Sequence, residues 1–169
     1  MDSSAPTYIL TAEMDADSFA WLDGLRRRHF PKARNVLSAH LTMFHRLSTA
    51  QIELLAGIDL PSAPLDLHFD GPVFLGAGVA IRVRSHGLDG LRQDVRSRMA
   101  DALSRQDAQT WKSHVTVQNK VTPDAARTLY RTLEQDFTAR RGHAAALLVW
   151  EYLGGPWKLE RRLPFAVAP

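Results

Sequence analysis

The sequence predicts an α+β protein of two pseudo-symmetric lobes, in which antiparallel sheets form a central cleft and helices lie on the outside. Two strand-like segments support this prediction: residues 40–49 read HLTMFHRLST and residues 114–123 read HVTVQNKVTP. Aligning these segments pairs His40 with His114 and Thr42 with Thr116. The apolar residues alternate in the same phase in both copies. The two copies lie 74 residues apart, a period that is too long for a solenoid and fits the duplication of a lobe.

The strands are indicated by alternating or β-rich segments that are separated by turn residues. They are expected at residues 7–14, in the two His-x-Thr segments, within residues 65–84 as two or three strands, and as a closing pair at 145–153 and 157–167. In each half the order is then helix, His-x-Thr strand, capped helix and strand pair. Residues 1–169 are therefore expected to form a single two-lobed domain.

The helices are indicated by apolar residues spaced three and four apart. They are expected from about residue 17 to Pro31, as a short helix after Ser48 or Thr49, from about 88 to 104, and after Thr122-Pro123. Asp15 or Asp17 can cap the first of these helices. The expected apolar faces are Phe19, Leu22 and Leu25 on the first helix, and Leu88, Leu91, Val95, Met99 and Ala102 on the third; His29 continues the spacing of the first helix and is expected at the surface or as a cap.

Composition excludes several classes of protein. A formal charge of +3 and a pI near 9.6 favour anionic ligands without requiring nucleic acid. The chain has no cysteine, so it has no disulfide framework and no Cys-ligated metal site. The polar start, MDSSAP, does not read as a signal peptide, and the longest apolar run, AAALLVW, is far shorter than the roughly 20 residues that span a bilayer. We therefore expect a cytoplasmic monomer with no membrane partner.

The repeated motif contains the parts of an acid–base catalyst. Residues two apart on a strand point to the same face, so each histidine projects together with its threonine. If the two strands meet about a pseudo-twofold axis, one imidazole can act as a base and the other as an acid, while the hydroxyls donate to phosphate oxygens. No metal and no cofactor is needed for such a reaction. Further cations that flank the motifs are Arg46, Lys112, Lys120 and Lys158.

HLT and HVT resemble the paired H-x-[T/S] motifs of the two-histidine (2H) phosphoesterase superfamily, often called the 2′-5′ RNA ligase family. The resemblance implies a two-lobed α+β fold with a central cleft and metal-independent hydrolysis of 2′,3′-cyclic phosphates or related nucleotide diesters. It transfers His40, Thr42, His114 and Thr116 as catalytic residues, with His40 as acid and His114 as base. Members often have proline before the second histidine, where this chain has Ser113, so the substrate within the superfamily stays open.

Two other functions remain open. The same cleft could bind a nucleotide or an RNA end without turning it over, or the motifs could be inherited and idle on a scaffold. Tyr152, Trp157 and Trp111 are either packing residues or a platform on which a base stacks; the first two are taken as substrate-binding residues, together with Arg46, Lys112 and Lys120. There is no GxxxxGK[ST] or GxGxxG motif to support an ATP-dependent ligase or a dinucleotide enzyme.

Two further expectations concern single side chains. His45 lies five residues after His40, an odd number of steps along a strand, so the two rings should face opposite sides and share no site. The arginines at 26–28 and 92–98 are expected on solvated helix faces, with contact to a phosphate backbone as the alternative.

Overall fold

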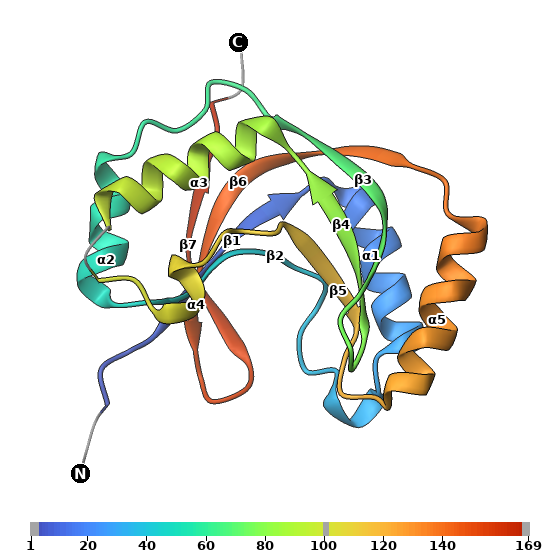
Figure 1. Cartoon of the computed structure of the whole chain (residues 1–169). Helices are drawn as coiled ribbons and strands as arrows, with labels where there is room; N and C mark the ends of the chain where they lie inside the picture. The colour runs from blue at the N-terminus through green and yellow to red at the C-terminus, as the bar shows by residue number, and fades with distance from the viewer. Residues whose placement is uncertain (1–3, 100–101, 167–169) are drawn as a thin grey trace.

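A single antiparallel sheet of seven strands organises the chain in the computed structural model, which describes residues 4–99 and 102–166. The strand order is β2-β1-β6-β3-β4-β5, with β7 also paired to β6. The strands are β1 (Tyr8–Met14), β2 (Leu41–Leu47), β3 (Leu65–Phe74), β4 (Val79–Arg84), β5 (His114–Gln118), β6 (Arg140–Tyr152) and β7 (Trp157–Pro164). The sheet curls into an arch with the helices outside it (Figure 1). The predicted α+β class is thus confirmed, and the expected sheets are the two halves of one curled sheet.

The helices lie between the strands in two matching sets. They are α1 (Ala16–His29), α2 (Thr49–Glu53), α3 (His86–Arg98), α4 (Arg105–Ala108) and α5 (Pro123–Asp136), with 3₁₀ turns η1 (Lys32–Arg34) and η2 (Leu54–Gly57). The order β1-α1-β2-α2-β3 recurs as β4-α3-β5-α5-β6. The repeat therefore begins with a strand, not with the helix that the sequence pattern indicated.

The two repeats exchange their last strands. β3 closes the first repeat in sequence but pairs with β4, and β6 closes the second repeat but pairs with β1. At the centre of the sheet β3 and β6 pair with each other. Each half of the sheet therefore contains strands from both repeats, and the pseudo-twofold axis passes between β3 and β6.

Side-chain caps fix the starts of the helices, as predicted. Asp15 accepts from the Ser18 amide at 3.1 Å, Ser48 and Gln51 form a reciprocal capping box, and Thr122 caps a helix with Pro123 in its first turn. The predicted end of the third helix is wrong. α3 ends at Arg98, and the side chain of Ser104 caps the separate short helix α4.

The core lies between the sheet and the helices and is built from the apolar positions of both repeats. Its largest fully buried side chains are Phe44, Phe69, Leu10, Leu22, Leu41, Met43, Leu47, Leu67, Ile81, Leu88 and Leu147. Two predicted core positions are wrong, since Phe19 is 38% exposed and Ala102 is exposed. On α1 the buried position beside Phe19 is Ser18, which faces the strand segment at Gly142.

Two arginines expected on solvated faces are instead buried and connect the two ends of the sheet. The guanidinium of Arg26 donates to the carbonyl of Thr116 on β5 at 3.0 Å, and Arg92 donates to the carbonyl of Met43 on β2 at 2.9 Å. Each also lies over a phenylalanine ring, Phe30 or Phe44, which satisfies the buried cation. Helix spacing alone did not reveal them because the partners are backbone carbonyls distant in sequence.

In the part of the chain that the structure describes, no helix is both long and apolar enough to cross a bilayer.

Candidate active site

The two His-x-Thr strands lie at opposite ends of the hydrogen-bonded strand order, yet they border one cleft. β2 and β5 are the terminal strands of the sheet, and its curl brings them into contact. The cleft between them has a volume of about 910 Å³. Its lining includes all four motif residues, His40, Thr42, His114 and Thr116. The convergence expected from the repeated motif is thus present in the geometry.

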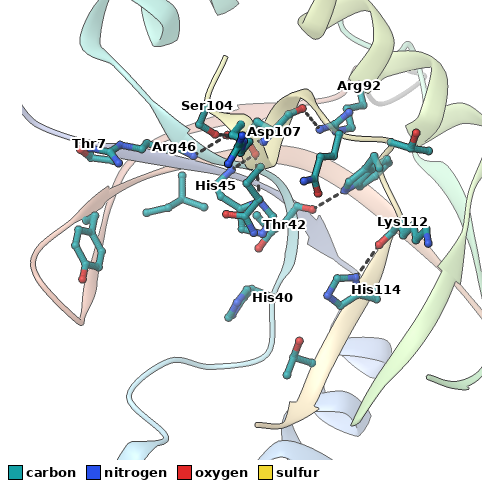
Figure 2. A pocket seen from close by; sticks show the side chains of 18 of the residues that line it. Thr7, His40, Thr42, His45, Arg46, Arg92, Ser104, Asp107, Lys112 and His114 are labelled. Atoms are coloured by element: carbon teal, nitrogen blue, oxygen red, sulfur yellow. Dashed lines mark hydrogen bonds and ion pairs between the residues drawn. The ribbon is translucent and has the colours of Figure 1, made fainter. Parts of the chain in front are cut away.

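The two histidines are held in the same way. Nδ1 of His40 lies 2.7 Å from the carbonyl oxygen of Ser38, and Nδ1 of His114 lies 2.6 Å from that of Lys112, in each case two residues earlier. A carbonyl oxygen only accepts, so Nδ1 carries the hydrogen and Nε2 is left for a ligand. Figure 2 shows the two rings on facing sides of the cleft.

His40 is more enclosed than the shared motif requires. Its ring packs against Trp157 with the centroids 4.6 Å apart, and Trp157 in turn packs against Trp150. Burial lowers the pKa of His40 to about 4; the hydrogen bond to Ser38 opposes this shift, and the positive charge of Arg26 adds to it. His40 is therefore neutral at pH 7.

The two threonines offer free hydroxyls to the cleft. Their carbonyls are already used: Thr42 accepts from the indole of Trp111 at 3.1 Å, and Thr116 accepts from Arg26. Their hydroxyls make no hydrogen bond with any described residue, and both side chains are half-buried. These backbone contacts fix both strands while each hydroxyl stays available as a donor to a bound oxyanion.

The expectation that His45 faces away from His40 is wrong. Thr42 pairs with Thr11 but Phe44 pairs with Leu10, so Met43 is an extra residue in the ladder and forms a β-bulge. Both Met43 and Phe44 are buried, which shifts the alternation by one residue and turns His45 into the same cleft as His40. The carbonyl of Met43 accepts from the buried Arg92, so the bulge has a fixed partner.

One wall of the cleft comes from the segment that precedes β5, of which the sequence pattern singled out only Trp111. Its lining residues are Ser104, Arg105, Gln106, Asp107, Gln109, Thr110 and Trp111. Asp107 is the buried centre of this wall at 1% exposure. The spacing of Ser104 and Asp107 is a capping-box pattern, and it is the signal that could have located the short helix α4.

Four of the five predicted substrate-binding residues lie on the cleft: Arg46, Lys112, Tyr152 and Trp157. Lys120 does not belong to the lining. It follows β5 in a turn with φ of 62°, beyond the end of the strand that carries His114. Lys158 is also outside the lining and pairs with Glu160 at 3.2 Å. Among residues 4–99 and 102–166, no group of three His, Cys, Asp or Glu side chains is placed to hold a metal ion.

Sequence comparison agrees with this geometry. The model of the 2′-5′ RNA ligase superfamily matches residues 14–156, and the chain belongs to this superfamily, the 2H phosphoesterases. Membership supports an enzyme that acts on phosphodiesters in general. No curated protein matches the chain.

Solved structures share the fold at low sequence identity. The structure is similar to LigT of E. coli in complex with 3′-AMP, with a TM-score of 0.64 and 15% identity over 97% of this chain and 100% of that one. It is also similar to LigT in complex with NADP+, with a TM-score of 0.64 and 16% identity over 98% and 100% of the two chains. The protein TT0787 of Thermus thermophilus gives a TM-score of 0.66 and 10% identity over 95% and 98%.

Proposed function

We propose that this protein is a metal-independent cyclic phosphodiesterase that hydrolyses 2′,3′-cyclic phosphates of nucleotides or RNA ends. The observation that carries the proposal is the matched pair of imidazoles. Both Nδ1 atoms are bound by backbone carbonyls, which leaves two Nε2 atoms on facing sides of one cleft. A site that only bound phosphate would need positive charge and donors, whereas two groups that exchange protons serve hydrolysis.

The reaction uses one group for each proton. Nε2 of one neutral histidine takes a proton from water, whose oxygen attacks the phosphorus. The bond from phosphorus to one ribose oxygen breaks, and Nε2 of the other, protonated histidine gives its proton to that oxygen. Thr42 and Thr116 donate to the non-bridging oxygens as negative charge grows on them. Proton exchange with solvent restores both rings.

The surroundings of His40 support its role as the base. A base must start neutral, and burial against Trp157 lowers the pKa of His40 to about 4, which keeps the ring unprotonated at pH 7 although it also weakens the ring as a proton acceptor. His114 then acts as the acid. This assignment is the reverse of the one that the family resemblance implies.

The remaining lining residues fit a nucleotide. Arg46 and Lys112 supply positive charge to the cleft, and Tyr152 and Trp157 supply aromatic side chains to its lining. A base that stacks on such a face gains roughly 1–3 kcal/mol without requiring a particular sequence. Residues from both repeats and from the β6–β7 hairpin would then hold a single substrate.

The test is a panel of nucleoside 2′,3′-cyclic phosphates, 2′-5′ dinucleotides and RNA with a cyclic phosphate end, assayed with EDTA present. We expect hydrolysis of the cyclic phosphates at an unchanged rate after exhaustive chelation. Loss of activity on chelation, with recovery on adding a divalent ion, would contradict the two-histidine mechanism. Tight binding of the same ligands without turnover would instead support the alternative of a nucleotide or RNA-end binding module.

A further inference from the structure

The cleft contains a third imidazole that the acid–base mechanism does not use. His45 reaches the cleft only because of the bulge at Met43, and its side chain is 39% exposed. Figure 2 shows His45 and Arg46 beside Asp107 and Ser104 at one end of the cleft, apart from His40 and His114. The second repeat has no counterpart, because the position that matches His45 is Asn119, which lies beyond the end of β5. His45 is therefore an addition to the duplicated site.

A buried carboxylate fixes the orientation of His45. Asp107 accepts from the backbone amide of His45 at 2.8 Å and from that of Arg46 at 2.9 Å. It also accepts from the hydroxyl of Ser104 at 3.0 Å and lies 3.1 Å from Nδ1 of His45. Burial alone would raise the pKa of Asp107, but these hydrogen bonds hold it below its ordinary value. The ionised carboxylate accepts the hydrogen on Nδ1, so Nε2 of His45 is left open to a ligand.

The same end of the cleft has positive charge that nothing in the described residues neutralises. Arg46 follows His45 on β2, and Arg105 follows Ser104 as the first residue of α4. Both guanidinium groups line the cleft, and neither forms an ion pair with any described residue. Among the described residues that line the cleft, Asp107 is the only carboxylate, and its oxygens are already occupied by the contacts above.

The opposite side of His40 has a different character. A second cavity, of about 590 Å³, adjoins His40 and Trp157 and is lined mainly by apolar side chains such as Phe19, Val36 and Leu148. One side of the catalytic pair is thus apolar and the other cationic. A substrate with an uncharged part and a second anion would find a separate place for each.

We infer that His45, Arg46 and Arg105 form a second anion subsite, which holds the phosphate on the 5′-oxygen of the nucleotide whose cyclic phosphate is cleaved. The substrate class that fits is the cyclic phosphate end of an RNA strand, where that 5′-oxygen carries the last internucleotide phosphate. An isolated nucleoside 2′,3′-cyclic phosphate would leave the subsite empty. The identity of the substrate in this inference rests on the proposed hydrolysis. The presence of the anion subsite does not.

The kinetic test compares two substrates that differ in one group: adenosine 2′,3′-cyclic phosphate with and without a 5′-phosphate. We expect the wild-type protein to prefer the 5′-phosphorylated substrate in kcat/KM by about 10-fold or more, the size of a charge-assisted hydrogen bond. His45→Gln and Arg105→Gln should each remove most of that preference and leave the unphosphorylated substrate within about twofold. His86→Gln and Arg131→Gln, which change exposed residues outside the cleft, serve as matched controls.

A binding test separates the subsite from catalysis. Calorimetry with 2′-AMP and adenosine 2′,5′-bisphosphate measures the effect of the 5′-phosphate without turnover, and the bisphosphate should bind about 10-fold more tightly to the wild-type protein only. Equal affinities, or a preference that persists in both variants, would overturn the subsite while leaving hydrolysis intact. A preference that depends on His45 and Arg105, in a protein that hydrolyses neither substrate, would retain the subsite and refute the proposed function.

Discussion

The two His-x-Thr strands have the same backbone design and different surroundings. In both, Nδ1 of the histidine is bound by the carbonyl two residues earlier, and the threonine hydroxyl makes no hydrogen bond within the described residues. On β2, however, His40 is enclosed by Trp157, and the bulge at Met43 adds His45 to the cleft. The duplication thus places two imidazoles in the same backbone setting, and the residues around His40 lower its pKa.

Each of the two strands is also supported by a buried arginine from the other repeat. Arg26 on α1 binds the carbonyl of Thr116 in the other repeat, and Arg92 on α3 binds that of Met43. Since these strands are the ends of the sheet and share no hydrogen-bonded neighbour among the described strands, such contacts hold the width of the cleft. The repeated backbone thus places the two imidazoles alike, and the residues that differ between the repeats give them different surroundings.

The largest expected effect comes from removing either imidazole. His40→Ala and His114→Ala should each lower kcat about 10²-fold to 10⁴-fold, because each removes one of the two proton transfers. The double variant should be little worse than the poorer single one, since the pair acts as a unit. Steady-state kinetics measure this, and circular dichroism checks that the variants fold. Strictly additive losses would mean that the two histidines do not share one reaction.

A smaller effect is expected from the paired hydroxyls. Thr42→Val and Thr116→Val keep the β-branched shape and remove one donor each, so kcat should fall roughly 10²-fold with little change in its pH dependence. Thr128→Val on the exposed face of α5 is the matched control. Full activity in either cleft variant would show that this hydroxyl serves the sheet rather than the phosphate.

The symmetry of the arginine supports can be tested through stability. Arg26→Met and Arg92→Met leave carbonyls of the opposite repeat without their donor, and each should lower the free energy of unfolding by about 1–3 kcal/mol in urea titrations. Arg27→Met should change it by less than about 0.5 kcal/mol, because the Arg27 side chain is 70% exposed. An effect confined to one of the two buried arginines would break the proposed equivalence.

The pH dependence of stability tests the asymmetry of the histidines. The pKa of His40 is about 4 in the folded protein, against 6.5 for an ordinary histidine. Between pH 4 and pH 6.5, His40 is therefore protonated to a greater extent in the unfolded chain than in the folded protein. Stability should therefore rise with pH across this window, by at most about 1.4 kcal/mol per pH unit from this group. His40→Gln should flatten the slope measured by urea unfolding. Identical slopes in the two proteins would show that His40 is not shielded from water.

The sequence by itself determined the features that depend on neighbouring residues. Alternation located most strands, the caps at Asp15, Ser48 and Thr122 were readable as short-range patterns, and the repeated His-x-Thr identified the superfamily and the four central residues of the cleft. The direction of a side chain along a regular strand depends only on its neighbours in the sequence. The hydrogen-bond acceptors for the first amides of a helix also come from residues a few positions away.

Only the tertiary structure decided which distant groups meet. The exchange of β3 and β6 between repeats, the burial of Arg26 and Arg92, and the contact of Asp107 with His45 all join residues far apart in the chain. The bulge at Met43 depends on pairing with β1 and reverses the direction that alternation gave to His45. Each of these features depends on residues that are distant in the sequence, so no local pattern predicts it. The register of the strands and the curl of the sheet are set by the packing of the whole core.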